Sequence, residues 1–393
     1  MRFATVRAMN ILFVANAYTP ALSGVALSAE RFRTSLEQLG HRVTVIAPRY
    51  RGHVENDPRI IRVPTFPNPL YPEYPFALFR FSRKLRARLQ QEHIQVVHVM
   101  QPFTVGRFAR TVARALNVPL VFTHHARYDL YAHYVPLVPK KIAARRVTRS
   151  VVRFANTCDL LIAPSRSTKE FMTARGITKP IEVIPTGLAH TYRSTQPKAE
   201  LRRQLSIPED AFLLLCVSRI SIEDKNLLLL LSAMPKIVAV LPKAHLILVG
   251  SGPDQAKLKE YAKTHGLEKF VRFEGPIQND QLDRYYTAAD LFVYPSISET
   301  QGIIILEALS AGLAVVATRA PGTIDFVSDG NNGLLTQNDP HSFAAAVIRV
   351  AQDQALRTEL AKNALPSVSA YTSEAVAKKL VSAYQQIGRT GTA

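Results

Sequence analysis

The chain has 393 residues, 47% hydrophobic and 20% charged, a length and composition typical of two globular domains rather than of a low-complexity protein. Its longest apolar runs are far shorter than a membrane-spanning helix, so no such helix is expected. The net charge is +19 at pH 7, and it comes almost entirely from residues 1–190, which contain 28 Lys and Arg against 10 Asp and Glu. This half is therefore expected to face an anionic partner, which is a membrane surface, a nucleic acid or an acidic polymer.

Strand-like and helix-like segments alternate along the chain, a pattern that predicts parallel sheets covered by helices. In the first half, strands are expected at 10–15, 42–47, 96–99, 120–123 and 160–163. In the second half, they are expected at 212–217, 245–249, 271–273, 291–294 and 314–317. Two similar α/β halves predict two Rossmann-like domains that face a central cleft, with the chain passing from one to the other near Pro185-Thr186-Gly187.

The N-terminal segment has basic residues and a short apolar stretch, the outline of a signal peptide. The stretch leads into a helical pattern and lacks a convincing cleavage site, so it is interpreted as a strand. Cys158 and Cys216 lie in different halves, which favours buried thiols over a disulfide. These features predict a protein of a reducing compartment, the cytoplasm.

Two predicted helices of the first half, over 78–91 and 140–156, separate apolar from basic residues. In the second helix, which has no acidic residue, the basic side carries Lys141, Arg145, Arg146, Arg149 and Arg153. Helices that cover a sheet explain the apolar sides but not outer faces that are almost purely basic. The basic side of 140–156 is therefore predicted to bind an anionic membrane surface, where each Lys or Arg contributes roughly 1 kcal/mol.

A cluster of aromatic and histidine side chains follows the predicted strand at 120–123. The chain continues His124-His125-Ala126-Arg127-Tyr128-Asp129-Leu130-Tyr131-Ala132-His133-Tyr134. One His at a strand end is usually a structural residue, but three His and three Tyr within so short a segment favour a functional cluster.

Arg219 and Lys225 follow the predicted strand at 212–217. A guanidinium fork and a compact ammonium both bind phosphate, although two solvated surface cations are the alternative. The chain has no convincing Asp-x-Asp and no His or Cys cluster with metal-ligand spacing, so no metal is expected.

Glu299 and Glu307 lie on either side of the start of a helix predicted near Gly302. Glu299, in a polar loop after a strand, can reach a site at the carboxyl end of the sheet. The first backbone N–H groups of the helix can bind an anion. Glu307, about one turn inside the helix, can accept hydrogen bonds from a diol such as a ribose. For an isolated pair of glutamates, an ordinary helix with a solvated carboxylate is the alternative.

This pair resembles the E-x7-E signature of the retaining glycosyltransferases of family GT4, which have the GT-B fold. Other family motifs occur in order: Val217-Ser218-Arg219, Lys225-Asn226, Val249-Gly250-Ser251-Gly252-Pro253 and Tyr294-Pro295-Ser296. The resemblance implies an acceptor-binding Rossmann-like domain over 1–187 and a nucleotide-sugar-binding one over 188–372. It also implies that a last helix, within about 373–393, packs back onto the first domain.

The same resemblance assigns roles to single residues. Arg219 and Lys225 correspond to the phosphate-binding cations that replace a metal ion, Glu299 to the residue that positions the sugar, and Glu307 to the ribose carboxylate. Gly24, Gly250, Gly302 and Ile303 are expected to meet the donor, although at Gly24 the family usually shows two glycines and this chain has one. His125 corresponds to the histidine that faces the sugar, and the acceptor side is expected to include Asn16, Tyr128, His133 and Tyr134.

The segment 123–136 resembles that of GT4 enzymes that glycosylate lipids. This implies transfer of a hexose, glucose from UDP-glucose, to diacylglycerol or a related lipid as an α-glycoside, by an enzyme peripheral to the cytoplasmic membrane face and without a cofactor. Where such enzymes often carry Asp after the first strand, this chain has Asn16, so a soluble enzyme with a sugar, polyol or small-metabolite acceptor stays open. A nucleic-acid-binding protein is disfavoured, because no binding motif occurs and the basic faces lack interleaved aromatics.

Overall fold

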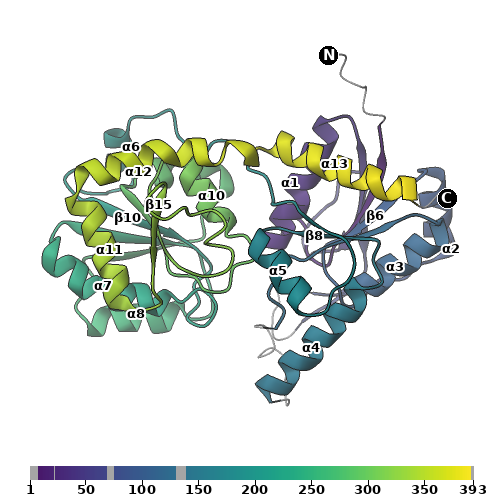
Figure 1. Ribbon diagram of the computed structural model, residues 1–393, viewed down its shortest axis with the longest axis horizontal. Helices are drawn as coiled ribbons and strands as arrows, with labels where there is room; N and C mark the ends of the chain where they lie inside the picture. The colour runs from purple at the N-terminus through teal and green to yellow at the C-terminus, as the bar shows by residue number, and fades with distance from the viewer. Residues whose placement is uncertain (1–7, 22, 69–74, 130–138, 391–393) are drawn as a thin grey trace. The chain divides into compact units, whose positions relative to one another are not determined.

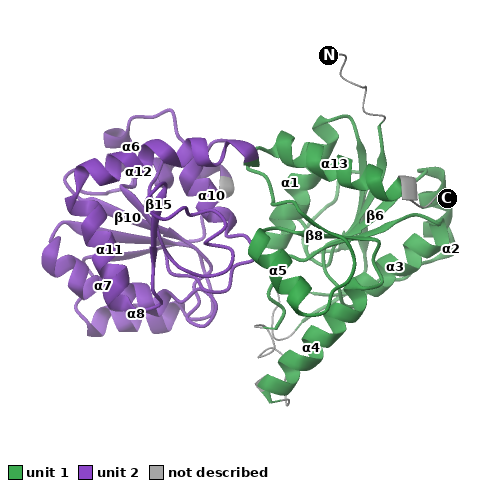
Figure 2. Cartoon of the chain, viewed as in Figure 1, with its two compact units in different colours: residues 1–189, 371–393 green, residues 190–370 purple. Residues whose placement is uncertain are grey.

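The computed structural model describes residues 8–21, 23–68, 75–129 and 139–390 (Figure 1). The chain forms two compact units (Figure 2). Unit 1 comprises residues 1–189 and 371–393, and unit 2 comprises residues 190–370. Each unit is built on a parallel sheet flanked by helices, as the alternating sequence pattern predicted.

The sheet of unit 1 has the order β3-β2-β1-β6-β7-β8-β9, and every neighbouring pair is parallel. A short antiparallel pair, β4 with β5, lies outside this sheet. The strands are β1 (Asn10–Val14), β2 (Arg42–Pro48), β3 (Ile60–Val63), β4 (Thr65–Phe66), β5 (Phe76–Ala77), β6 (Val96–Val99), β7 (Leu120–Thr123), β8 (Leu160–Ala163) and β9 (Ile181–Val183). The helices are α1 (Gly24–Gln38), α2 (Arg83–Gln91), α3 (Thr104–Leu116), α4 (Lys140–Ala155), α5 (Arg166–Ala174) and α13 (Ser373–Thr390).

Both faces of the unit 1 sheet are apolar, because helices cover each of them. Successive side chains of a strand point to opposite faces. Leu12 and Val14 of β1 accordingly pack into a core with α2, α3 and α4. Ile11 and Phe13 pack into a second core with α1 and the C-terminal helix α13.

A buried histidine joins α13 to the sheet. His98 of β6 places Nδ1 at 2.6 Å from the Tyr384 hydroxyl of α13 and Nε2 at 2.6 Å from the Thr123 hydroxyl of β7. Burial, and secondarily His125, lowers the pKa of His98 to about 3, so the ring is neutral and each nitrogen has a hydroxyl partner. The last helix is therefore an integral part of unit 1.

The sheet of unit 2 has the order β12-β11-β10-β13-β14-β15, again wholly parallel. Its strands are β10 (Phe212–Val217), β11 (Ala244–Val249), β12 (Val271–Gly275), β13 (Leu291–Tyr294), β14 (Val315–Thr318) and β15 (Gly333–Thr336). Its helices are α6 (Lys198–Gln204), α7 (Leu227–Val240), α8 (Gln255–Thr264), α9 (Leu282–Ala288), α10 (Ile303–Ser310), α11 (Pro340–Gln352) and α12 (Gln354–Ser367).

Both sheets have the strand order of a doubly wound fold, in which the direction of winding reverses between two central strands. That switch point lies between β1 and β6 in unit 1 and between β10 and β13 in unit 2. Ligands of such sheets bind beyond the carboxyl ends of the strands at this point. The loops after these four strands are therefore the places to look for a site.

Two sequence predictions differ from the structure. The helix expected over 78–91 begins only at Arg83, where the Ser82 hydroxyl accepts a hydrogen bond from Leu85 N and caps the helix. Leu78, the first residue of the predicted helix, instead follows β5 and is 49% exposed. β3, β9 and β15 were not predicted at all, because these short strands lack a continuous apolar run.

Candidate functional site

The predicted donor residues of unit 2 lie in two loops at its switch point. Arg219 and Lys225 belong to the connection between β10 and α7, and Glu299 belongs to the connection between β13 and α10. Asn226 joins the two loops, since its Nδ2 donates to the backbone oxygen of Pro295 at 3.1 Å. The structure thus brings together residues that lie more than 70 positions apart in the chain.

The Glu299 carboxylate is held by three donors. Oε1 accepts hydrogen bonds from the Lys225 ammonium, from the Tyr294 hydroxyl at 2.6 Å and from the Ser296 hydroxyl at 2.7 Å. Burial alone raises the pKa of Glu299, but the Lys225 charge and these hydrogen bonds outweigh it and hold the pKa below its usual value. Glu299 is therefore an anion at neutral pH.

Arg219 supplies a second cation from the same loop as Lys225. Its side chain is 37% exposed, and Nη1 lies 3.9 Å from the Asp224 carboxylate, at the edge of ion-pair distance. The Ser298 hydroxyl donates to the backbone oxygen of Asp224 at 2.7 Å, which fixes the loop. The switch point therefore presents an arginine and a lysine from one short, well-anchored segment.

Gly250 lets a neighbouring turn approach this segment. It has a φ of +131°, and a Cβ there would lie 1.9 Å from the backbone oxygen of Ser218. Only glycine adopts this conformation without strain and fits this space. Gly250, which is predicted to meet the donor, thus has a clear structural role: it lets the turn after β11 pack directly against Ser218, the residue that precedes Arg219.

The helix predicted to begin near Gly302 is α10. Gly302 is its N-cap, with φ +65°, and Ile303 is its first residue. The first backbone N–H groups of a helix have no partner within the helix and favour an anion. The N–H groups at the start of α10 lie a few residues after Glu299 in the chain, a position suited to binding a phosphate. The contact itself stays a prediction.

Glu307 is buried within unit 2. Its side chain is 1% exposed, and Oε2 accepts a hydrogen bond from the Tyr286 hydroxyl at 3.1 Å. Tyr286 packs edge-on against Tyr192, with ring centroids 5.7 Å apart. The carboxylate therefore has a structural partner, and its contact with a ribose remains a prediction.

At the switch point of unit 1, a glutamine that the sequence did not predict joins two loops. The Gln101 Oε1, after β6, accepts a hydrogen bond from the backbone N–H of Asn16, after β1, at 2.8 Å. Asn16 is exposed, as a residue on the acceptor side needs to be. Gly24 is the first residue of α1, and a Cβ there would meet nothing within 4 Å, so no steric constraint requires a glycine.

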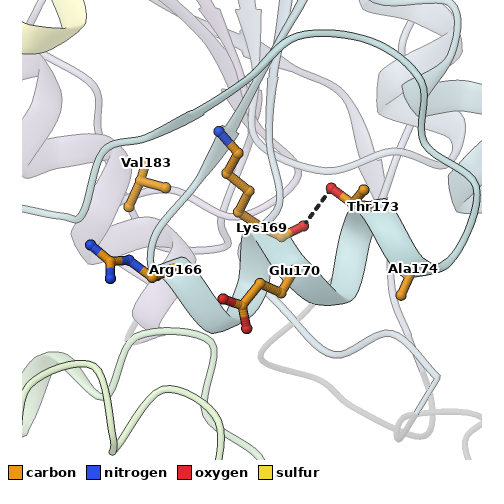
Figure 3. A pocket seen from close by; sticks show the side chains of 6 residues that line it. All are labelled: Arg166, Lys169, Glu170, Thr173, Ala174 and Val183. Atoms are coloured by element: carbon orange, nitrogen blue, oxygen red, sulfur yellow. Dashed lines mark hydrogen bonds between the residues drawn. The ribbon is translucent and has the colours of Figure 1, made fainter.

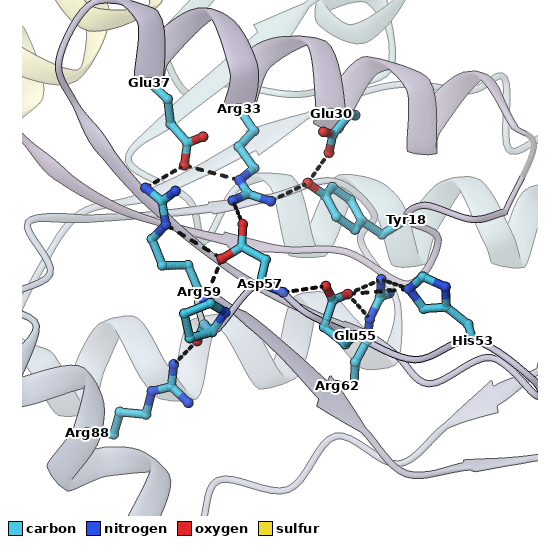
Figure 4. A network of polar contacts seen from close by, with 11 residues as sticks. Tyr18, Glu30, Arg33, Glu37, His53, Glu55, Asp57, Arg59, Arg62 and Arg88 are labelled. Carbon is cyan, nitrogen blue, oxygen red and sulfur yellow. Dashed lines mark hydrogen bonds and ion pairs between the residues drawn. The ribbon is translucent and has the colours of Figure 1, made fainter.

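A network of charged residues fixes the segment that follows β1 (Figure 4). The Tyr18 hydroxyl contacts Glu30 and Arg33 of α1, and Arg33 also pairs with Asp57. Arg62 of β3 donates to the backbone oxygen of Thr19 at 2.7 Å. These contacts tie the segment after Asn16 to both α1 and β3.

The two described histidines of the cluster are neutral, with His124 buried and His125 partly buried. His124 is 3% exposed, and burial lowers its pKa to about 4. Burial, and secondarily His124, lowers the pKa of His125 to about 3. His125 can therefore exchange neutral hydrogen bonds with a sugar hydroxyl at neutral pH, but it carries no charge there.

Tyr128 lies edge-on between Phe103 and His124, with centroid distances of 5.4 and 5.3 Å. An ion pair between Arg127 and Asp129, at 2.9 Å, holds the loop just beyond it. The other two predicted acceptor residues, His133 and Tyr134, lie outside the described residues.

The basic side predicted for α4 is exposed in the structure. Ala143, Val151 and Phe154 of the same helix are buried in unit 1. The N-terminal part of α4 extends away from the unit 1 sheet (Figure 1). The exposed cations are Lys141, Arg145, Arg146, Arg149 and Arg153. The helix thus offers a continuous cationic surface, and what it binds remains a prediction.

A hollow on unit 1 lies along α5 (Figure 3). It is lined by Arg166, Lys169, Glu170, Thr173, Ala174 and Val183. The Thr173 hydroxyl donates to the backbone oxygen of Lys169 at 3.0 Å, and the charged side chains are exposed. It has no buried polar group directed into it, so we assign it no role.

Over the described ranges, no three His, Cys, Asp or Glu side chains come together as a metal site. In the same part of the chain, no helix is long and apolar enough to cross a membrane. Cys158 and Cys216 are buried free thiols, as predicted.

Comparison with solved structures identifies the fold. Anabaena Alr3699/HepE, solved in complex with UDP-glucose, superimposes with a TM-score of 0.75 at 21% identity, over 96% of this chain and all of that one. The fold is GT-B, as predicted, and the protein is a glycosyltransferase.

Sequence comparison identifies the family. The family Glycosyltransferase Family 4 matches residues 22–191, and Glycosyl transferases group 1 matches residues 197–365. The alpha-monoglucosyldiacylglycerol synthase of Streptococcus pneumoniae is 31% identical over 86% of this chain and 78% of its own length. The synthase of the same name from Acholeplasma laidlawii is 29% identical over 96% of both chains. The chain belongs to the GT4 family of glycosyltransferases.

Proposed function

We propose that this enzyme transfers glucose from UDP-glucose to diacylglycerol or a closely related membrane lipid, with retention of configuration, to form an α-glucoside. The similarity to two alpha-monoglucosyldiacylglycerol synthases, over nearly the whole chain in one case, carries this proposal. Unit 2 binds the nucleotide-sugar in the proposal, and unit 1 binds the acceptor.

The donor chemistry follows from the switch point of unit 2. The bond between the anomeric carbon and the diphosphate breaks, and negative charge grows on the leaving oxygen. Arg219, Lys225 and the first N–H groups of α10 stabilise this charge, and because they are preorganised they favour the transition state. Their positive charge takes the place of a metal ion, so no cofactor is required.

The acceptor hydroxyl attacks the anomeric carbon from the side on which the diphosphate leaves. Its proton passes to the departing phosphate oxygen, so that the new glycosidic bond has the configuration of the old one. Glu299 positions the hydroxyls of the sugar. His125 is neutral, and it orients the sugar by hydrogen bonding rather than by charge.

The acceptor is an insoluble lipid, so the enzyme must reach a membrane surface. The exposed cations of α4 supply an attraction for anionic lipids without a spanning segment. We therefore place the enzyme at the cytoplasmic face of the membrane as a peripheral protein, with the membrane surface as its partner.

The proposal is tested by UDP release from a panel of UDP- and GDP-sugars, with and without diacylglycerol in mixed vesicles. We expect UDP-glucose to be the best donor and diacylglycerol to raise the rate, with an α-glucosylated lipid as the product. An equal rate without lipid, or a product of inverted configuration, contradicts the proposal.

The cationic surface gives a separate prediction. Replacing Arg145, Arg149 and Arg153 with Gln should weaken binding to vesicles that contain anionic lipid by a factor on the order of 10², since each cation contributes about 1 kcal/mol. Binding of the parent should itself weaken as salt rises, because attraction between exposed charges is screened over about 8 Å at physiological ionic strength. Vesicle sedimentation at several salt concentrations measures both effects.

A matched control removes three exposed cations from unit 2. Changing Lys236, Lys259 and Lys263 to Gln alters the net charge equally but leaves α4 intact. This variant should bind vesicles as the parent does. Donor hydrolysis in solution should be unchanged in both variants. Equal sedimentation of the α4 variant and the parent would show that this face is only a solvated surface.

A soluble acceptor is the second candidate. Asn16 is exposed after β1, at a position where lipid-glycosylating relatives often carry Asp. A sugar, polyol or small metabolite that accelerates UDP release more than diacylglycerol does would favour it.

A further inference from the structure

Glu299 has more hydrogen-bond donors than an ion pair needs. Besides Lys225, the Tyr294 hydroxyl at 2.6 Å and the Ser296 hydroxyl at 2.7 Å bind the same oxygen, Oε1. The motif that led to Glu299 assigns no role to the tyrosine. Its hydroxyl requires an explanation, because Phe in its place would fill nearly the same space within the core.

The two hydroxyls and the ammonium come from different parts of unit 2. Tyr294 is the last residue of β13, is 1% exposed and belongs to the same short segment as Glu299, as does Ser296, which is wholly buried. Lys225 comes from the connection after β10, and its side chain is 17% exposed. The Tyr294 hydroxyl is thus fixed at a strand end and that of Ser296 two residues later, whereas the ammonium lies on a flexible stem.

Close packing also restrains the backbone of Glu299. A Cβ at Gly322, where φ is +80°, would lie 2.6 Å from the backbone oxygen of Glu299 and 2.7 Å from its Cβ. The turn at Gly322 therefore presses directly on this residue, and the carboxylate has little freedom to follow Lys225 if the ammonium moves.

On the basis of the proposed function, we infer that Tyr294 is a positioning residue for Glu299. Its hydroxyl, together with that of Ser296, keeps the carboxylate oriented and ionised while Lys225 moves from Glu299 to the diphosphate of the donor.

The physical reason is the cost of a buried charge. The Glu299 side chain is only 13% exposed, and a carboxylate so largely buried is destabilised by the loss of its cation unless hydrogen bonds remain to stabilise the charged form. The ionisable groups that face Glu299 are Lys225 and Tyr294, with Cys216 behind the tyrosine. Burial, followed by the Glu299 charge, raises the pKa of Tyr294, and burial raises that of Cys216 to about 12. Both groups are therefore neutral, and Tyr294 always has a proton to donate.

The first test is the kinetics of Tyr294→Phe. Turnover should fall about tenfold, the effect expected for one hydrogen bond to a charged group, while the KM for the donor changes by less than about twofold. Glu299 works as a carboxylate, so activity is lost as the pH falls through its pKa. Loss of a donor raises that pKa, and the acid limb of the turnover profile should shift about one unit upward.

The second test measures the carboxyl group directly, without any transfer reaction. In protein labelled with ¹³C at the Glu carboxyls, the Glu299 signal is assigned by its absence in Glu299→Gln. UDP should leave Glu299 of the parent ionised at pH 6. In Tyr294→Phe, UDP should raise the pKa of Glu299 further than it does in the parent. Lys225 then binds the diphosphate of UDP, and the variant lacks the Tyr294 hydroxyl that still stabilises the carboxylate in the parent. If no nucleotide binds, the proposed function fails, and a higher Glu299 pKa in the ligand-free variant still supports the inference.

The matched control is Tyr285→Phe, which removes a tyrosine hydroxyl that donates to Glu274 at 2.8 Å elsewhere in unit 2. It should keep the pH profile and turnover of the parent. If Tyr294→Phe does not fold, Ser296→Ala should shift the turnover, the acid limb and the Glu299 pKa in the same directions, but by less. The inference is overturned if the Glu299 pKa and the acid limb match those of the parent, if only the donor KM rises, or if the control shifts equally.

Discussion

Replacing Lys225 with Ala is expected to lower turnover by a factor on the order of 10²–10³, the range seen when a preorganised donor to a developing negative charge is removed. Lys225 lies at the switch point of unit 2, paired with Glu299. Its loss removes a cation from the leaving group and also leaves the carboxylate without its counter-charge. Arg219→Ala should have an effect of the same order. Steady-state release of UDP measures both variants.

A control lysine in unit 2 separates this effect from a general change of charge. Lys243 pairs with Asp210 at 2.7 Å, and both side chains are well exposed, so Lys243→Ala should keep the turnover of the parent. Activity of the parent should also survive EDTA, since Arg219 and Lys225 supply the positive charge. Near-parent turnover of Lys225→Ala, or an absolute requirement for Mg²⁺, would show that these cations do not replace a metal.

Much of the fold could be predicted because both sheets are parallel and buried on both faces. Such strands appear in the sequence as continuous apolar runs. β6, β7, β8, β10 and β13 were predicted residue for residue. β3 and β9 were missed, since at three or four residues, with a charged residue within each, they differ little from loops. Their pairing with a neighbouring strand, rather than their own sequence, makes them strands.

The candidate site could be predicted to the extent that its residues lie in local motifs. The sequence predicts separate roles for Lys225 and Glu299, and the structure shows a hydrogen bond between their side chains. Tyr294 lies in a motif that assigns it no role, and Gln101 carries no signal in the sequence, because a glutamine in a loop is common. Their importance comes from the partner each one meets, which depends on how the loops fold together.

The two glutamates allow a sharper test of the site, because their expected defects differ. Glu299→Ala should lower turnover by a factor on the order of 10² and change the KM for the donor little, since the residue positions the sugar in the transition state. Glu307→Gln should raise the KM for the donor about tenfold with turnover nearly unchanged, since one charged hydrogen bond to a ribose is lost. Full kinetics with UDP-glucose separate the two effects.

Glutamine is the right replacement at Glu307 because this side chain is 1% exposed. The amide keeps the shape of the carboxylate, and its oxygen can still accept the hydrogen bond of the Tyr286 hydroxyl. Glu274→Gln makes the same change at another glutamate that accepts from a tyrosine, Tyr285, and should leave both constants as in the parent. If Glu307→Gln and Glu299→Ala both keep parent kinetics, neither carboxylate contacts the donor. A ribose contact by Glu307 requires in addition that UDP itself binds about tenfold more weakly to Glu307→Gln, because UDP retains the ribose but lacks the transferred sugar.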